Sequence, residues 1–239
     1  MTDTADEASA AARYTSGAYL ESNPDWHVED SAWKAQQVKA MLARHDLRPG
    51  SVCEVGCGAG EVLVQLQRLL DRETRFAGYE ISPQAYELAR ARANDRLDVL
   101  LADLTQERDA HFDLLLFDVI EHLEDPFAFL RAVRPRAERT MLHIPLDMTV
   151  QAVARNLLIT SSRAPLGHLH YFQKETALAT LADAGYEVLD WCYTPSTFAQ
   201  PASGLRARII QGLRRVMFRA APDLTQRLIG GWSLLVLAP

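Results

Sequence analysis

The chain has 239 residues, of which 48% are hydrophobic and 23% are charged, the composition of an ordinary globular protein. Its 31 Asp and Glu outnumber its 25 Lys and Arg, giving a formal net charge of -6. General nucleic-acid binding is not expected, because phosphate neutralisation requires an excess of Lys and Arg.

No apolar run approaches the roughly 20 residues that span a bilayer. The first twenty residues do not resemble a secretory signal, and the odd count of 3 Cys suits a reducing cytoplasm. We expect a cytoplasmic protein.

The first segment of the chain, residues 1–30, carries seven acidic residues and one Arg. We expect it to form an acidic tail, with residues 31–239 as the folded domain. Tyr19, Trp26 and Trp33 make this region too aromatic for a simple linker. These rings could close over a cleft as a lid, or they could belong to the core.

From residue 31 onward, helical and extended patterns alternate. Apolar spacing and capping residues predict helices over 31–45, 61–70, 83–93, 125–133, 148–160 and 173–184. Short apolar runs predict strands over 51–55, 75–80, 97–101, 112–117, 139–144, 186–193 and 232–237. Such alternation is typical of a parallel sheet with helices on both faces. A ligand is then expected at the carboxyl ends of the strands.

The first strand is followed by a glycine-rich turn, Glu-Val-Gly-Cys-Gly-Ala-Gly over 54–60. Gly56, Gly58 and Gly60 allow a sharp turn and a close approach of a ligand to the backbone. The spacing differs from the dinucleotide fingerprint, and no Walker lysine follows. Glu54 would repel a pyrophosphate but suits a ligand with a positive charge. The alternative is a glycine turn without a ligand.

Acidic residues also follow the next three strands. Glu80 ends the second strand, where a carboxylate can accept both hydroxyls of a ribose. Asp103 follows the third strand and could accept the amine of an adenine, with Leu104 against the ring. Asp118 ends the fourth strand. Each acid alone could be a surface residue or a helix cap, but four in succession indicate a shared site.

Taken in order, these motifs resemble those of class I S-adenosylmethionine-dependent methyltransferases, closest to the small-molecule branch that includes ubiquinone-biosynthesis-like enzymes. The matching residues are Glu54–Gly60, Glu80, Ala102-Asp103 and Asp118–Leu123. The resemblance spans about residues 44–193, and 232–237 resembles the last strand of that fold. It implies a Rossmann-like, seven-stranded, mostly parallel sheet of order 3-2-1-4-5-7-6, with strand 7 antiparallel and helices on both faces. It also implies S-adenosylmethionine as cofactor and S-adenosylhomocysteine as product.

The resemblance further implies a set of cofactor-binding residues. The glycines would admit the methionine and ribose parts, Glu80 would hold the ribose hydroxyls, and Asp103 with Leu104 would frame the adenine. Cys57 is expected to be a small filler without a catalytic role. The full predicted set is Glu54, Gly56, Cys57, Gly58, Gly60, Glu80, Ile81, Asp103, Leu104, Asp118 and Val119.

The acceptor side is less defined, and several histidines are candidates. A hydroxyl acceptor needs a base, and His is the side chain best suited to that role near neutral pH. His168 is the preferred candidate because the resemblance places a His there, and His143 and His122 are the others. His170 lies in the same loop and is grouped with the possible lid residues. The alternative for each is a structural histidine. We expect a small-molecule acceptor, preferably an oxygen nucleophile rather than nitrogen or carbon.

Two other functions fit part of the pattern. Asp118-x-x-Glu121-His122 together with His168 resembles the metal site of small-RNA 3′-end methyltransferases. We nevertheless expect no metal, because Glu-His after the fourth strand also occurs in metal-free members and the chain is acidic. The other alternative is a non-catalytic cofactor-binding partner protein, against which the intact glycine turn and Glu80 argue.

An insertion over about 194–231 interrupts the pattern before the last strand. It contains a predicted amphipathic helix over 204–220 with five Arg and no acid. Residues 200–239 hold six Arg and one Asp, a charge of +5. The favoured interpretation is a helix packed on the sheet edge with solvated or paired Arg. Peripheral membrane contact, guidance of an amphiphilic or anionic acceptor, or a dimer face are the alternatives, and the state is monomer or homodimer.

Overall fold

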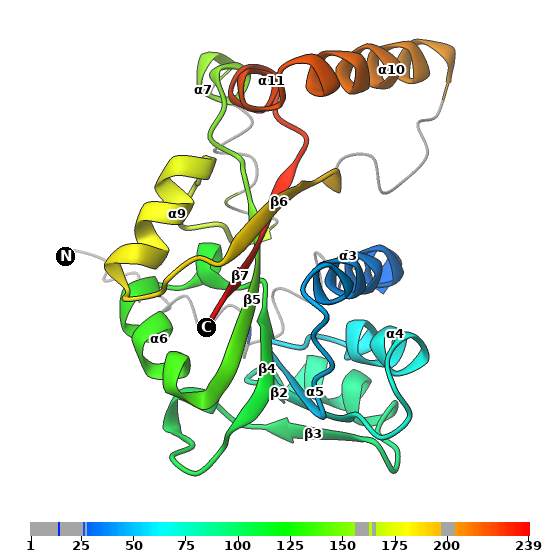
Figure 1. Ribbon diagram of the computed structural model, residues 1–239, viewed down its shortest axis with the longest axis vertical. Coiled ribbons are helices and arrows are strands. Elements are labelled where there is room, and N and C mark those ends of the chain that lie inside the picture. Colours follow the sequence, from blue (N-terminus) through cyan, green and yellow to red (C-terminus); the bar gives the residue numbers. More distant parts are fainter. Residues whose placement is uncertain (1–13, 15–25, 27, 156–162, 164–165, 197–203) are drawn as a thin grey trace, which may run out of the picture.

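The computed structural model describes residues 14, 26, 28–155, 163, 166–196 and 204–239. Within these residues the strands form a seven-stranded sheet of order β3-β2-β1-β4-β5-β7-β6 (Figure 1). The strands are β1 (Ser51–Val55), β2 (Arg75–Glu80), β3 (Leu97–Leu101), β4 (Phe112–Phe117), β5 (Ala137–Pro145), β6 (Asp190–Thr194) and β7 (Ser233–Ala238). β1 to β5 are parallel, whereas β7 is antiparallel to both of its neighbours. The predicted Rossmann-like sheet is confirmed.

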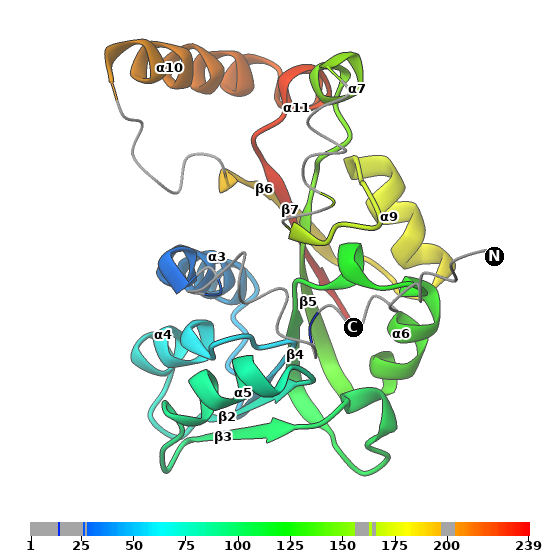
Figure 2. The same cartoon turned by 180° about the vertical axis from the view of Figure 1, so that it is seen from behind.

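Helices cover both faces of this sheet. On one face lie α3 (Ser31–Arg44), α4 (Glu61–Leu69) and α5 (Pro83–Arg90), and on the other lie α6 (Pro126–Val133) and α9 (Lys174–Asp183) (Figures 1 and 2). Buried apolar side chains of each helix, such as Met41, Leu66, Leu130 and Leu181, pack against the sheet. Short 3-10 helices are η1 (Val28–Asp30), η2 (Leu104–Gln106), η3 (Ile120–His122) and η4 (Arg134–Arg136).

Local sequence signals set where several helices begin and end. The Ser82 hydroxyl caps α5 by accepting from the backbone N–H of Ala85, and proline occupies the first helical position. Asp125 caps α6 in the same way. Gly185, with a φ of 91°, follows α9 and allows the chain to turn away.

The strand register brings the ends of β1, β2 and β4 together. Val55, the last residue of β1, pairs with Tyr79 on one side and Phe117 on the other. The residues that follow these strands therefore meet at one edge of the sheet, the edge where ligands bind in open parallel sheets.

Some predicted boundaries were wrong. The strand predicted over 186–193 starts only at Asp190, because Tyr186 instead packs against α6 and donates a hydrogen bond to the Leu130 carbonyl. The helix predicted over 148–160 is α7 (Val150–Arg155), and 156–160 lie outside the described residues.

The described residues of the insertion between β6 and β7 form two helices, where a single one was predicted. α10 (Leu205–Ala220) matches the prediction, and α11 (Pro222–Ile229) follows directly, with proline in its first turn. Together with α7, these helices lie at one end of the molecule (Figure 1). In the described parts of the chain, no helix combines the length and apolarity needed to cross a membrane.

Candidate functional site

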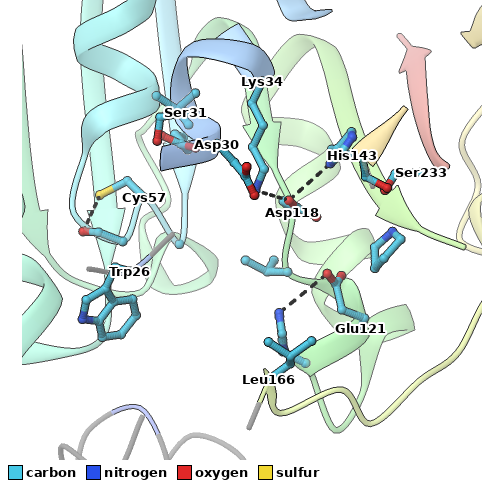
Figure 3. Close-up of a pocket in the computed structure, with 18 of the residues that line it drawn as sticks. Trp26, Asp30, Ser31, Lys34, Cys57, Asp118, Glu121, His143, Leu166 and Ser233 are labelled. Atoms are coloured by element: carbon cyan, nitrogen blue, oxygen red, sulfur yellow. Dashed lines mark hydrogen bonds and ion pairs between the residues drawn. The ribbon is translucent and has the colours of Figure 1, made fainter. Parts of the chain in front are cut away.

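A cavity of about 650 Å³ opens at the carboxyl ends of the parallel strands (Figure 3). It is lined from α3, from the turns after β1, β2, β4 and β5, and from the segments that flank the insertion. The predicted cofactor residues among its lining are Glu54, Gly56, Cys57, Gly58, Glu80, Ile81, Asp118 and Val119. The sequence motifs thus converge on one volume.

The glycine-rich turn forms a cradle that leaves no room for larger residues. Gly56 has a φ of 68°, and a Cβ atom there would lie 2.6 Å from Val119 Cγ1. Gly58 has a φ of 54°, a conformation that L side chains rarely adopt. Gly60, with a φ of 77°, begins α4 and does not line the cavity, but a Cβ there would crowd Ala89 at 3.2 Å. Cys57 is buried and packs closely against Gly78 of β2. A Cβ atom on Gly78 would lie only 2.7 Å from the Cys57 Sγ, so this thiol fills the space beside the glycine, as a small filler would.

Glu80 is fixed beside this turn by backbone amides. Its Oε2 accepts from Gly58 N–H at 2.8 Å, and its Oε1 accepts from Ile81 N–H and Ser82 N–H, both at 2.8 Å. The residue is 4% exposed, and this burial raises the pKa of its carboxyl although the three amides act in the opposite direction. The carboxylate is therefore held between the glycine-rich turn and the backbone that follows β2, in the wall of the cavity.

Asp103 and Leu104 lie just beyond β3 but do not line the cavity. The exposed Asp103 caps η2 by accepting from Thr105 N–H at 2.9 Å, and Leu104 is fully buried in the core. The helix-cap alternative therefore describes the geometry of Asp103. Its role toward an adenine stays a prediction.

A charged network that the sequence did not indicate crosses the cavity wall. Lys34 of α3 reaches Asp118 with an Nζ–Oδ2 distance of 2.7 Å, and His143 Nδ1 lies 3.3 Å from the same oxygen (Figure 3). His143 Nε2 is 2.8 Å from the Thr194 hydroxyl, so both ring nitrogens have partners. Burial alone would raise the pKa of Asp118, but Lys34 and His143 outweigh it and hold that pKa well below its usual range. Asp118 is thus a fixed anion rather than a proton acceptor.

Glu54 is a further acidic residue next to this network. Its Oε2 atom is buried without a hydrogen-bond partner among the described residues. Burial raises the pKa of Glu54 to about 8, with Lys34 opposing the shift and Asp118 and Glu80 adding to it. A cationic ligand group in the cavity would satisfy this carboxylate.

His168 enters the site on a segment anchored to η3. The backbone N–H groups of Leu169 and His170 both donate to the Glu121 carbonyl, at 2.7 and 3.0 Å. His168 is 7% exposed, and its Nδ1 lies 2.7 Å from Asp147 Oδ2. His168 and Asp147 both line the cavity. Because Asp147 occupies Nδ1, Nε2 is the ring nitrogen left to take a proton.

The other predicted histidine of the loop has a different place. His170 Nε2 lies 2.8 Å from the Leu123 carbonyl, and the residue is not among those that line the cavity. It therefore helps to hold the segment that carries His168. Of the predicted lid residues, Trp26 and Trp33 line the cavity, Trp33 contacts the His143 ring edge to face, and Tyr19 lies outside the described residues.

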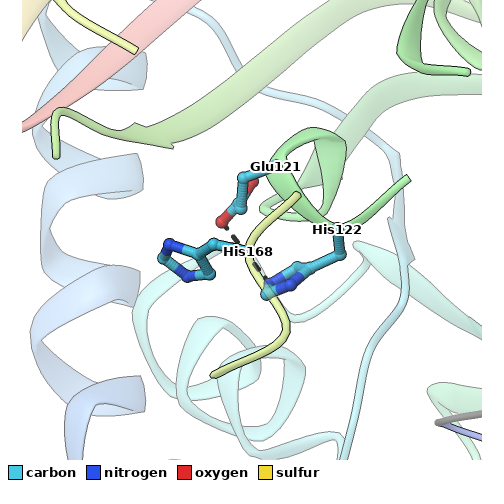
Figure 4. Close-up of side chains that lie close together, drawn as sticks. All are labelled: Glu121, His122 and His168. Atoms are coloured by element: carbon cyan, nitrogen blue, oxygen red, sulfur yellow. Dashed lines mark ion pairs between the residues drawn. The ribbon is translucent and has the colours of Figure 1, made fainter. Parts of the chain in front are cut away.

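Glu121, His122 and His168, the histidine that contacts Asp147, form a compact cluster (Figure 4). One potential ligand atom of each lies within 4.8 Å of the others. Glu121 Oε2 is buried without a hydrogen-bond partner in the described part of the chain. Burial, and then the neighbouring His168, lower the pKa of His122 to about 4, so that it is neutral at pH 7. Oxygen and neutral imidazole ligands in this arrangement have the chemistry of a divalent metal site.

Three important residues of this site were missed by sequence reasoning: Lys34, Asp147 and Trp232. Lys34 lies on the helix before the first motif, and nothing in its local pattern distinguishes it from a surface lysine. Asp147 lies two residues after the end of β5, and Asp118 directly follows β4, so its position after a strand was an available signal. Trp232 was assigned to the last strand, whose first residue is instead Ser233.

Comparisons with known proteins agree with this geometry. A family model described as a methyltransferase domain matches residues 27–190. No curated protein matches the chain. The fold is similar to magnesium protoporphyrin IX methyltransferase from Synechocystis with bound S-adenosylhomocysteine, at 18% identity over 90% of this chain and 85% of that chain, with a TM-score of 0.58.

Two further solved structures share the fold. An S-adenosylmethionine-dependent methyltransferase from Aquifex aeolicus is 14% identical over 92% of this chain and 97% of that chain, with a TM-score of 0.58. The plantazolicin methyltransferase BpumL is 18% identical over 95% of this chain and 89% of that chain, with a TM-score of 0.55. The family match covers more than half of the chain. The predicted class is confirmed: the chain belongs to the methyltransferase domain family.

Proposed function

We propose that this methyltransferase uses S-adenosylmethionine to methylate an oxygen atom of a small-molecule acceptor, with His168 as the general base. The observation that carries the proposal is the His168–Asp147 pair, joined at 2.7 Å in the wall of the same cavity that holds the glycine turn and Glu80. A cavity of about 650 Å³ is the size that encloses small molecules.

The residues of the cavity fit the proposed cofactor. Gly56 and Gly58 line the cavity, so a ligand can approach the backbone of the turn there. Glu80 supplies a fixed carboxylate for ribose hydroxyls. Glu54, whose pKa burial raises to about 8, would ionise and supply a second negative charge when a cationic ligand group lies beside its buried Oε2 atom. When bound, S-adenosylmethionine supplies an electrophilic methyl group on a positively charged sulfur.

Among the titratable residues of the wall, His168 is the best placed to remove a proton from a hydroxyl. Asp118 is tied to Lys34, and both nitrogens of His143 are engaged. His122, with a pKa lowered to about 4 by burial and by His168, is a weak base. In His168, the Asp147 carboxylate accepts from Nδ1–H, fixes the tautomer, and stabilises the imidazolium that forms when Nε2 takes the proton.

The test follows a labelled methyl group. The purified chain is incubated with methyl-labelled S-adenosylmethionine and a panel of alcohols, phenols, amines and thiols of matched size. We expect label in O-methyl products, in a reaction that S-adenosylhomocysteine inhibits. Transfer confined to the amines or thiols of the panel would overturn the oxygen assignment while leaving the methyltransferase assignment in place.

A second candidate is a metal-assisted transfer, favoured by the Glu121–His122–His168 cluster. Here His168 Nε2 would be a ligand while Asp147 orients the ring from behind, the usual arrangement of metal-bound histidines. The direct measurement is calorimetric titration of the metal-stripped protein with Co²⁺ and Mg²⁺, beside the Glu121→Gln variant. The base mechanism predicts full turnover after chelation. Saturable binding that Glu121→Gln abolishes, together with turnover lost on chelation and restored by the ion, would favour the metal.

The raised pKa of Glu54 predicts how the stability of the folded protein depends on pH. Its pKa is about 8 in the fold against an ordinary value of 4.5, so the native state binds more protons than the unfolded chain between these values. Native stability is then lost as pH rises through this range, and Glu54→Gln removes the loss. At pH 8.5 we expect Glu54→Gln to be about 4 kcal/mol more stable, with a Tm about 10 °C higher, and within about 1 kcal/mol of wild type at pH 5.

The measurement is thermal unfolding of both proteins at pH 5 and pH 8.5, with the exposed Glu138→Gln as the matched control. The control should show no pH-dependent gain. An equal change in Tm at both pH values, or none at either, would show that burial of the Glu54 charge does not destabilise the fold.

A further inference from the structure

The helix α10 turns its apolar stripe away from the protein. Ile209, Leu213 and Val216 follow helical spacing and are 62%, 60% and 63% exposed. An amphipathic helix of a globular domain normally buries such a stripe against the core. The interpretation favoured from the sequence, a helix packed on the sheet edge with solvated or paired arginines, did not include this exposed apolar stripe.

The contact that does attach α10 to the body lies on the opposite side of the helix. Phe218 stacks on Trp232 with ring centroids 4.1 Å apart and an interplanar angle of 9°, and it meets Tyr193 edge to face at 5.4 Å. At 100° per residue, Phe218 lies roughly 170° from the centre of the Ile209–Leu213–Val216 stripe. The stripe consequently faces outward because of the way the helix is anchored.

Arginines flank the stripe on both sides. The segment 204–220 carries Arg206, Arg208, Arg214, Arg215 and Arg219 and no acidic residue. In the described part of the chain, no ion pair to an acid joins Arg206, Arg208 or Arg219, which are all exposed. The surface is therefore apolar in its centre and positively charged at its edges.

We propose that α10 docks this methyltransferase on an anionic lipid surface. A helix with apolar residues on one face and Arg beside it lies in the plane of a membrane interface, with the arginines at the headgroups and the apolar side chains below them. At 16 residues, α10 is suited to lying on a bilayer rather than crossing it. A symmetric contact with a second copy is less suited, because it would bring the arginines of both copies together.

Neighbouring helices extend the apolar surface at this end of the molecule. Leu224 of α11 is 56% exposed, and Val150 and Val153 of α7 are 58% and 59% exposed. These three helices lie in a row in both views (Figures 1 and 2). This end of the molecule therefore exposes apolar side chains on α7 and α11 as well as on α10.

The docking surface is connected to the cavity. Trp232, on which Phe218 stacks, lines the cavity, as does Ser233 at the start of β7. A bilayer under α10 would therefore lie across this helix from the cavity, within reach of an amphiphilic acceptor. This consequence, that the acceptor is amphiphilic, rests on the proposed function, whereas the docking itself does not.

The test is sedimentation of the full chain with vesicles, without any methyl acceptor. We expect it to pellet with phosphatidylglycerol-containing vesicles and not with pure phosphatidylcholine, and to be released at about 0.5 M salt. Leu213→Ser with Val216→Ser should weaken partitioning at least about tenfold, and Arg208→Gln with Arg219→Gln should do so by a similar factor. The matched control is Leu88→Ser on α5, a partly exposed leucine at the other end of the molecule.

Several outcomes would overturn the proposal. They are an absence of pelleting with anionic vesicles, equal pelleting with neutral vesicles, or full binding by the Leu213→Ser, Val216→Ser variant. The surface would instead be assigned to a second copy of the chain if two results were found together. The protein would not bind vesicles, and light scattering would show the mass of a dimer that the Leu213→Ser, Val216→Ser variant no longer forms. Calorimetry with S-adenosylhomocysteine on the same samples reports separately on the cofactor site, so that failure of docking and failure of the proposed function are distinguished.

Discussion

Replacing Glu80 by Gln is expected to lower the affinity for S-adenosylhomocysteine by about 100-fold or more. The carboxylate accepts from three backbone amides, and an amide group in its place would set an N–H donor against the N–H of Gly58, Ile81 or Ser82. The change also removes the charge that we assign to the ribose hydroxyls. The lost hydrogen bonds and the lost charge both weaken cofactor binding at the glycine-rich turn beside Glu80.

Calorimetric titration measures this loss, with Glu87→Gln on the exposed face of α5 as the matched control. We expect the Tm of Glu80→Gln to fall as well, because a buried donor left without an acceptor costs about 1–3 kcal/mol. Near-normal affinity in a variant with a lowered Tm would mean that Glu80 only shapes the turn, and its assignment to the ribose would be withdrawn.

Replacing His168 by Ala is expected to reduce turnover by about 10²–10⁴-fold while the affinity for S-adenosylhomocysteine stays within twofold of wild type. The residue contacts Asp147 and the Glu121–His122 cluster, not the glycine turn, so its loss should spare the cofactor site. Asp147→Asn should give a smaller loss, because the ring keeps a polar partner but not a charged one.

The readouts are single-turnover methyl transfer and calorimetry on the same preparation, with the exposed His111→Ala as control. Unchanged turnover in His168→Ala contradicts the assignment of the base. A parallel loss of turnover and cofactor affinity would instead give His168 a structural role in holding the loop.

The sheet and the glycine turn could be predicted because their signals are local. Short apolar runs predicted the seven strands, and glycine at positions that need a positive φ predicted the cradle at Gly56 and Gly58. The order of the strands came from the resemblance rather than from the patterns. Local patterns also failed where tertiary packing decides, as at Tyr186, whose apolar ring joins the core against α6 instead of starting β6.

The proton-handling part of the site was less predictable because its pairs are distant in sequence. Lys34 and Asp118 are 84 residues apart and meet only because α3 packs over the carboxyl edge of the sheet. Asp147 and His168 meet because the backbone after His168 hydrogen-bonds to the Glu121 carbonyl. His143 was predicted from its place at the end of β5, but that position could not show that Asp118 and Thr194 engage both ring nitrogens.

The orientation of α10 is a third feature that the sequence patterns could not predict. Its sequence specifies an apolar stripe, and such a stripe ordinarily packs inward. Here Phe218 on the other side of the helix contacts Trp232 and Tyr193, and the periodicity of the sequence could not have revealed this anchoring.

The most direct measurement is calorimetric titration of the chain with S-adenosylhomocysteine, because every assigned role depends on this ligand group fitting the cavity. We expect saturable 1:1 binding in the micromolar range that Gly56→Ala abolishes, since a Cβ there would lie 2.6 Å from Val119 Cγ1. A folded protein that gives no saturable heat with S-adenosylhomocysteine or S-adenosylmethionine would contradict the proposed function.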